Sequence, residues 1–189
     1  GLFNVQKASG GTTASDLCSA AGAQILSLIP TDIKRVKALI FVTQTPDYFL
    51  PSNAAIAHRN LELPSWCAAF DVNQGCAGYV YGLWLGSMIL QGAEDGDRVL
   101  LLAGDTMSRC ADSFDPATRP LFGDAGSATL LVSERTCRPF VFDLNMDGSG
   151  VDSLIIESGG FRDLANGGAQ SKPKLKMNGL DVYHRAMKR

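Results

Sequence analysis

The chain has 189 residues and a net charge of −2, with 46% apolar and 19% charged residues. These values exclude an intrinsically disordered chain and a collagen-like chain, and the near-neutral charge argues against nucleic acid as a partner. The length favours one domain, or at most two small ones. We place a single domain over residues 1–189, with a core large enough to need no disulfide or metal.

The pattern of apolar, glycine and proline residues predicts helices and strands that alternate along the first half of the chain. The predicted helices are Thr12–Ile29, Pro51–Leu61 and Cys76–Leu90, and the predicted strands are Lys37–Thr45, Trp66–Val72, Arg98–Gly104 and Ser127–Ser133, with Phe140–Leu144 as a candidate fifth. The first two strands are expected to be buried. Short links between alternating elements indicate parallel βαβ units. The fourth strand follows a loop rather than a helix, which leaves an antiparallel direction open for it.

Residues 72–93 carry no charge, and a stretch of this length could cross a bilayer. Polar side chains and five glycines interrupt it, however, and the residues that flank it, Asp71 and Glu94, are acidic rather than basic. A short strand that runs into a buried helix fits this pattern better. We therefore expect no membrane insertion.

The cysteines are odd in number and lack a Cys-x-x-Cys spacing; they are Cys18, Cys67, Cys76, Cys110 and Cys137. This arrangement suggests neither a disulfide scaffold nor a zinc site. Reduced cysteines are typical of the cytoplasm, where we expect the protein to be found. We expect no bound metal or cofactor.

The segment Asp71–Gly78 (DVNQGCAG) joins the end of a strand to an apolar helix through a glycine-bearing turn, and it places Cys76 in the first turn of that helix. Backbone N–H groups and the helix dipole favour negative charge there, and hence a thiolate. A nucleophile in such a turn is suited to acyl transfer, because the same N–H groups could hold the oxyanion of a thioester adduct. The alternative is that Cys76 is a small buried side chain of the core, as the other four cysteines are expected to be.

Three glycines recur at four-residue spacing on the helix after Cys76, at Gly78, Gly82 and Gly86. Each glycine within a helix costs about 1 kcal/mol relative to alanine, so three aligned glycines require a closely packed neighbour. No partner element is evident in the sequence. We therefore expect a missing half of the fold or a dimer contact to fill this place.

A second turn motif, Leu121–Gly126 (LFGDAG), precedes the fourth strand, and Asp124 in it can fix the turn by accepting backbone N–H groups. We expect it to support the neighbouring site rather than bind phosphate, because it opens no helix. Both histidines, His58 and His184, are expected on the surface or on a dimer face. The residues thus offer a nucleophile but no general base.

Four motifs together resemble the first half of 3-oxoacyl-[acyl-carrier-protein] synthase III, a family with the thiolase fold. They are Asp71–Gly78 (DVNQGCAG), Ala103–Arg109 (AGDTMSR), Leu121–Gly126 (LFGDAG) and Met177–Val182 (MNGLDV). The resemblance implies an α/β fold: a mostly parallel, five-stranded mixed sheet with helices on both faces in αβα layers. It also implies that the first strand and the C-terminal half are absent, so that residues 1–189 form an N-terminal domain truncated at both ends.

The resemblance implies that Cys76 is the nucleophile of a transferase of fatty acid biosynthesis. It would take an acyl group from acyl-CoA or from an acyl-carrier-protein thioester, its own N–H would join an oxyanion hole, and a decarboxylative Claisen condensation with malonyl-carrier protein would follow. The implied partners are acyl-carrier protein and a second copy of the chain in a homodimer. Structural support of the site is expected from Asp71, Gly78, Gly123 and Asp124.

Two departures from the family pattern concern the substrate. Where the family has Asp-Arg-x-Thr, this chain has Asp115-Pro116-Ala117-Thr118, which removes an arginine used against the CoA adenine and brings acetyl-CoA into question as the primer. Arg119, displaced along the chain, is the remaining candidate for CoA binding. Leu50 matches a bulky position that reaches into the partner's acyl pocket, and Phe122 is the other expected residue of the pocket or dimer face.

Three alternatives stay open at the level of sequence. Hydroxymethylglutaryl-CoA synthases share the architecture, and other members of the fold transfer acyl groups to form C–O or C–N bonds. The isolated chain could also serve as a dimerisation or interaction module without turnover. The family's catalytic His and Asn lie in its second half, so we expect the isolated chain to be inactive.

Overall fold

The computed structural model describes residues 5–29, 32–112, 114–136, 139–166 and 172–187. The contacts between its residues divide the chain into two compact units. The larger, here called the sheet unit, comprises residues 8–106 and 124–144. The smaller, here called the small unit, comprises residues 1–7, 107–123 and 145–189. We describe each unit by itself.

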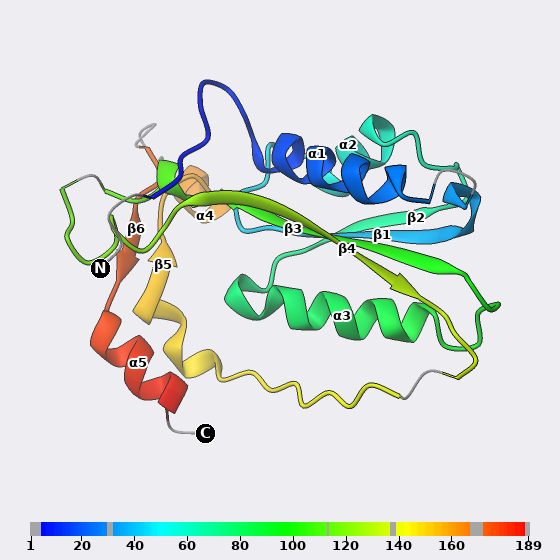
Figure 1. The fold of residues 1–189 in the computed structure, drawn as a ribbon. Coiled ribbons are helices and arrows are strands. Elements are labelled where there is room, and N and C mark those ends of the chain that lie inside the picture. Colours follow the sequence, from blue (N-terminus) through cyan, green and yellow to red (C-terminus); the bar gives the residue numbers. More distant parts are fainter. Residues whose placement is uncertain (1–4, 30–31, 113, 137–138, 167–171, 188–189) are drawn as a thin grey trace. The chain divides into compact units, whose positions relative to one another are not determined.

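The sheet unit contains a four-stranded sheet in the order β2-β1-β3-β4 (Figure 1). Its strands are β1 (Val36–Val42), β2 (Ala68–Val72), β3 (Arg98–Thr106) and β4 (Asp124–Val132). β1 runs parallel to both β2 and β3, whereas β4 runs antiparallel to β3, with Thr106 opposite Asp124. The parallel βαβ units are confirmed, and the direction left open for the last strand is antiparallel.

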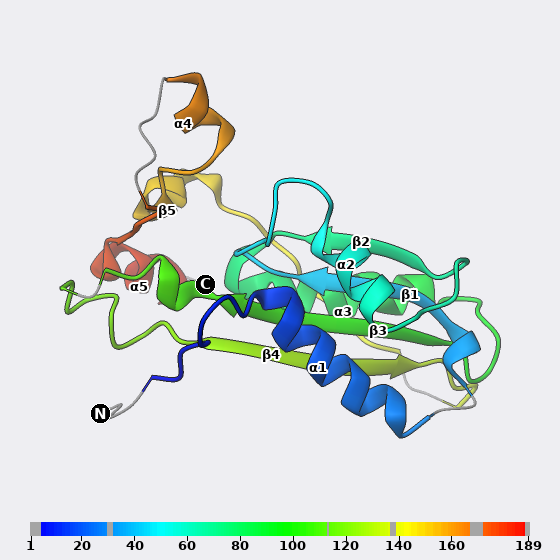
Figure 2. The same ribbon diagram turned by 90° about the horizontal axis from the view of Figure 1, so that it is seen from above.

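Helices cover both faces of this sheet. α1 (Ala14–Ser27) and α2 (Asn53–Asn60) lie on one face, and α3 (Gly78–Ile89) lies on the other (Figures 1 and 2). All three helices fall within the predicted ranges, and the α/β class with αβα layers is confirmed. In the described part of the chain, no helix combines the length and the apolar character needed to cross a membrane.

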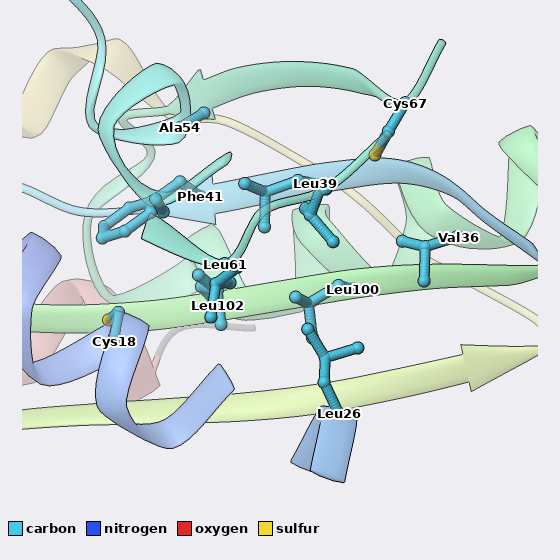
Figure 3. Close-up of a cluster of buried hydrophobic side chains, with 12 residues drawn as sticks. Cys18, Leu26, Val36, Leu39, Phe41, Ala54, Leu61, Cys67, Leu100 and Leu102 are labelled. Atoms are coloured by element: carbon cyan, nitrogen blue, oxygen red, sulfur yellow. The ribbon is translucent and has the colours of Figure 1, made fainter. Parts of the chain in front are cut away.

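The core of the sheet unit has two layers because successive strand side chains point to opposite faces. Toward α1 and α2, the strands contribute Leu39, Phe41, Leu100 and Leu102, which pack with side chains of the helices and their flanking loops (Figure 3). Toward α3, they contribute the alternate residues, which are Ala38, Ile40, Val42, Val99 and Leu101. β1 and β3 are therefore buried on both faces, as expected of central parallel strands.

The glycine stripe on α3 packs against this sheet, so the expectation of a missing half or a dimer contact at the stripe was wrong. A Cβ atom at Gly78 would lie 2.5 Å from Val42 Cγ1, and one at Gly82 would lie 2.5 Å from Leu101 Cδ1. Gly86 approaches the side chain of Leu131 on β4 in the same way. The glycines thus let α3 lie close on β1, β3 and β4, which the sequence alone could not reveal because those strands are distant along the chain.

On the opposite face, α1 crosses two glycines that pair with each other across β3 and β4, Gly104 and Gly126. A Cβ atom at Gly126 would lie 2.5 Å from the carbonyl carbon of Leu17 and 2.7 Å from the backbone nitrogen of Cys18. At Gly104 it would lie 2.5 Å from Cys18 Sγ. The backbone of α1 therefore rests almost directly on the sheet at this point.

Two predictions about strands were wrong. Phe140–Leu144 forms no strand, because these residues pair with no neighbouring strand and an apolar pattern alone makes none. The sheet accordingly has four strands rather than five. β2 is not buried as predicted: Ala68 and Ala69 are exposed. β2 is an edge strand, with β1 as its one neighbour in the sheet.

The small unit contains a two-stranded antiparallel sheet and two short helices. Its strands are β5 (Leu154–Ile156) and β6 (Leu175–Met177), and its helices are α4 (Phe161–Ala165) and α5 (Gly179–Met187). A 3₁₀ segment over Gly148–Ser153 precedes β5. Arg185 on α5 bonds to Asp181 at 2.8 Å and to Ser149 Oγ at 2.8 Å, which ties the helix to that segment.

Candidate active site

The carboxyl ends of three strands of the sheet unit meet at one edge. Val42 at the end of β1 lies in register with Val72 at the end of β2 and with Ala103 near the end of β3. The loops that follow these strands therefore open at the same edge. In parallel α/β sheets this is where ligands bind.

Cys76 lies in the turn that follows β2 at this edge. A 3₁₀ turn over Gly75–Ala77 carries it, and α3 begins directly afterwards at Gly78. Gly75 has a φ of +56°, a left-handed conformation that glycine adopts without strain. The Cys76 side chain is exposed, and Cys76 lies in the 3₁₀ turn directly before α3 rather than in the first turn of the helix, as was predicted.

Asp71, five residues before Cys76, anchors the start of α2. Its Oδ2 accepts the backbone N–H of Asn53 at 2.8 Å, and its Oδ1 accepts that of Ala54 at 2.6 Å. A carboxylate at this point satisfies two of the N–H groups that a helix leaves unpaired and complements the helix dipole. The end of β2 is thereby fixed to α2.

A chain of polar contacts continues from Asn53 to the start of α1. Asn53 donates from Nδ2 to Asp47 Oδ1 at 3.1 Å and accepts the backbone N–H of Asp47 at 2.9 Å. Asp47 Oδ2 in turn accepts the hydroxyls of Thr13 at 2.8 Å and Ser15 at 2.5 Å. Leu50, in the loop between Asp47 and α2, has 85% of its surface exposed. Sequence reasoning missed Asp47 and Asn53.

Asp105 near the end of β3 collects five donors from a single three-residue segment, Thr43–Thr45, after β1. Its Oδ1 accepts the N–H of Gln44 at 2.6 Å and that of Thr45 at 3.1 Å. The hydroxyls of Thr43 and Thr45 reach the same oxygen at 2.9 and 3.1 Å, and Gln44 Nε2 reaches Oδ2 at 3.3 Å. Sequence reasoning also missed this carboxylate, although its place at the end of a predicted strand was a signal.

The remaining described cysteines differ from Cys76 in exposure. Burial raises the pKa of Cys18 to about 12, against a hydrogen bond with the backbone of Ser127 that lowers it. Burial likewise raises the pKa of Cys67 to about 11. Cys110 is half-buried, and Cys137 lies outside the described residues. Cys76 is the exposed thiol among the described cysteines.

The histidines occupy structural places. His58 on α2 is half-buried, with Nε2 3.0 Å from the carbonyl oxygen of Pro64. His184 on α5 is exposed and stacks edge-on against Tyr183. His184 thus lies on the surface, and the His58 ring closes the turn after α2; the position on a dimer face stays a prediction.

Residues 115–118, which differ from the Asp-Arg-x-Thr pattern of the family, lie in the small unit. Asp115 accepts the hydroxyl of Thr118 at 2.7 Å and the N–H of Ala117 at 2.9 Å, and these bonds lower the pKa of its carboxyl group. Thr118 is fully buried, whereas Arg119 is exposed. The acidic residue thus stabilises its own turn.

The turn motif before β4 divides between the two units. In the small unit, Phe122 is half-buried, and a Cβ atom at Gly123 would lie 2.9 Å from Val5 Cγ1. In the sheet unit, Asp124 Oδ2 accepts the N–H of Ala8 at 2.8 Å. Asp124 therefore holds the segment before α1.

The family model and the relatives that are similar to this chain have related names. The family described as 3-Oxoacyl-[acyl-carrier-protein (ACP)] synthase III matches residues 70–150, a span that includes Cys76 and Asp105. A Campylobacter jejuni protein provisionally named a 3-oxoacyl-[acyl-carrier-protein] synthase 3 is 35% identical over 93% of this chain and 52% of its own length. A Clostridium perfringens β-ketoacyl-[acyl-carrier-protein] synthase III is 33% identical over 92% of this chain and 54% of its own length.

Solved structures of proteins with related names have a similar fold. A 3-oxoacyl-(acyl-carrier protein) synthase from Burkholderia xenovorans superposes with a TM-score of 0.79 at 37% identity, over 96% of this chain and 53% of that one. The chain spans about half the length of the curated relatives it matches. By sequence and by fold, the chain is similar to proteins of the 3-oxoacyl-[acyl-carrier-protein] synthase III family over about half of their length.

Proposed function

We propose that Cys76 is the nucleophile of a β-ketoacyl-[acyl-carrier-protein] synthase III reaction carried out by the whole protein. The observation that supports this most is the exposed thiol in a tight turn between the end of β2 and the start of α3. Backbone N–H groups at the start of α3 favour negative charge on an adduct oxygen in this place.

The first step transfers an acyl group to the protein. The Cys76 thiolate attacks the carbonyl carbon of acyl-CoA or of an acyl-carrier-protein thioester, and the negative charge moves to the carbonyl oxygen. Backbone N–H groups of the turn stabilise this oxyanion. When the tetrahedral adduct collapses, the carbon–sulfur bond to the donor breaks, the donor thiolate leaves and takes up a proton, and acyl-Cys76 remains.

The second step forms a carbon–carbon bond. Malonyl-carrier protein loses CO2, the resulting enolate carbon attacks the acyl carbonyl, and the Cys76 thiolate is released as 3-oxoacyl-carrier protein forms. A His and an Asn, which the family holds in its second half, stabilise the enolate in this scheme. We further propose acyl-carrier protein as the partner, a homodimer as the assembly, and the cytoplasm as the location.

Labelling of Cys76 tests this proposal. The whole protein is incubated with a radiolabelled acyl-CoA or acyl-carrier protein, and the label is located by peptide mass spectrometry. We expect label on Cys76 and none after Cys76→Ser, whereas Cys110→Ser, which removes a half-buried thiol, retains the label. Undiminished labelling of Cys76→Ser would refute the nucleophile.

Product analysis separates condensation from simple transfer. With malonyl-carrier protein added, we expect a 3-oxoacyl product and release of CO2. An acyl ester or amide without CO2 release would instead indicate transfer to oxygen or nitrogen.

A further inference from the structure

We infer that Asp105 is a positioning residue for the turn that carries Cys76, acting through Gln44. The inference rests on the proposed function for its catalytic consequence, but its geometry does not depend on the acyl substrate. Asp105 lies near the end of β3, and Cys76 follows β2, with β1 between the two strands in the sheet. The segment after β1 therefore links them.

Asp105 accepts hydrogen bonds from every residue of the segment Thr43–Thr45 after β1. Both carboxylate oxygens accept hydrogen bonds, and the five donors all belong to Thr43–Thr45. The hydroxyl of Thr45 also accepts the N–H of Thr106 at 2.9 Å, which closes the connection back to β3. Bonds to a charged acceptor are about twice as strong as neutral ones, so the segment after β1 has little freedom to move.

Gln44 transmits this order to the turn after β2. Its Nε2 donates to Asp105, and its Oε1 lies 3.7 Å from the place where a Cβ atom of Gly75 would be. The turn is also held on its other side, because Gly78 lies against the side chain of Val42. Gly75 therefore lies beside the Gln44 side chain that Asp105 bonds, and Gly78 lies close against Val42 of β1.

The position of the segment after β1 affects the direction of the N–H groups around Cys76. An oxyanion site works only if its donors already point to the place where charge develops, and a displacement of 1 Å can cost about a hundredfold in rate. Replacing one carboxylate oxygen of Asp105 with an amide removes the acceptor for Gln44 Nε2 or for the backbone donors. The turn then loses its lateral support without any change to Cys76 itself.

The test compares two carboxylates at opposite ends of β3, the half-buried Asp105 and the buried Asp97. Asp105→Asn is compared with Asp97→Asn, because Asp97 lies just before β3, is 3% exposed and accepts the N–H of Glu94 at 3.1 Å. A third variant, Gln44→Leu, keeps the backbone bond of Gln44 to Asp105 and removes only its side-chain polar atoms. Each whole-protein variant is assayed for Cys76 alkylation by iodoacetamide across a range of pH, for acyl transfer, and for unfolding in urea.

We expect Asp105→Asn and Gln44→Leu to slow acyl transfer in kcat by between about tenfold and about a hundredfold, with KM nearly unchanged. Both should also alter the pH profile of Cys76 alkylation. Asp97→Asn should lower stability and leave the alkylation profile and kcat as they are. If Asp105→Asn fails to fold, Gln44→Leu provides the measurement.

Equal loss of kcat in Asp97→Asn, or unchanged alkylation and kcat in Gln44→Leu, would overturn the inference. Failure of the proposed function is a separate result: wild-type protein would then be alkylated at Cys76 but would take no acyl label. In that case the alkylation profiles alone still decide whether Asp105 positions the turn.

Discussion

The two units of the chain are stabilised in different ways. In the sheet unit, central strands are enclosed by helices on both faces, and polar groups are concentrated at the carboxyl edge, around Asp47, Asp71 and Asp105. In the small unit, the strands have three residues each, and many of the described contacts join exposed charges, such as Lys176 to Glu157. The comparison shows that the turn carrying Cys76 is built by the unit with the larger core.

This difference suggests which contacts can be changed without loss of the fold. Buried apolar area contributes about 25 cal/mol per Å², whereas exposed ion pairs contribute little and are screened by salt. Both tryptophans, Trp66 and Trp84, lie in the sheet unit, so fluorescence reports on that unit alone. Tryptophan fluorescence therefore follows the unfolding of the sheet unit, and the small unit needs a different measurement.

The largest effect is expected from a cavity in the sheet. Leu100→Ala should lower the free energy of unfolding by about 2–5 kcal/mol, because Leu100 on β3 is fully buried in the core layer toward α1 and α2. Urea unfolding followed by tryptophan fluorescence measures it. The matched change in the small unit, Leu154→Ala, should leave the fluorescence midpoint almost unchanged. An equal shift from both variants would show that the units unfold as one, which would break the comparison.

The next effect concerns the contact of α1 with the sheet. Gly126→Ala should lower the free energy of unfolding by about 1–3 kcal/mol, because the new methyl group would meet the backbone of Leu17 and Cys18. Gly11→Ala is the control, since a Cβ atom there meets nothing within 4 Å. The same urea titration applies. Equal stability of the two variants would contradict the close approach.

A smaller effect depends on pH. Burial raises the pKa of Cys18 to about 12 from a usual value of about 8.5, so the protonated thiol is favoured in the folded state. The contribution of the Cys18 thiol to the free energy of unfolding is complete at pH values below the usual thiol pKa. It is lost as the pH rises toward the pKa of the folded state, because the thiol ionises first in the unfolded chain. Between pH ~8 and pH ~10 the loss should be about 1–2 kcal/mol. Cys18→Ala should have a flatter dependence of stability on pH, whatever its absolute stability; an unchanged slope would exclude Cys18 as the cause.

The smallest effect is expected on α5 in the small unit. The hydroxyl of Ser153, and then Arg185, lower the pKa of Asp181. These contacts are therefore complete above the usual pKa of an aspartate, about 4, and are lost as pH falls through the lower folded value. Arg185→Ala should speed amide hydrogen exchange in α5, less so in high salt. Unchanged exchange would mean that the exposed ion pair contributes nothing measurable.

The elements of the sheet unit could be predicted from sequence because each has a local signal. A run of apolar and β-branched residues predicted β1, and the predicted helix Pro51–Leu61 contains α2, at whose start Ser52 Oγ accepts the N–H of Ala55. Neighbours in the sheet have no local signal. The edge position of β2 and the absence of a strand at Phe140–Leu144 both depend on which segments pair, and pairing is a long-range property.

At the candidate site, too, features with a local sequence signal could be predicted and features that depend on long-range contacts could not. The turn that carries Cys76 could be predicted, because strand, glycine turn, cysteine and helix are consecutive in the chain. Asp105 and Asp47 could not, because each acts on residues that lie far along the chain and its role exists only once the strands are side by side. The partner of the glycine stripe was missed for this reason as well.

The antiparallel direction of β4 has one more consequence. Because Thr106 lies opposite Asp124, the chain between them leaves and re-enters the sheet at a single pair of residues. The paired residues from Arg98–Val132 to Thr106–Asp124 therefore set the register of β3 and β4, and the length of residues 107–123 does not.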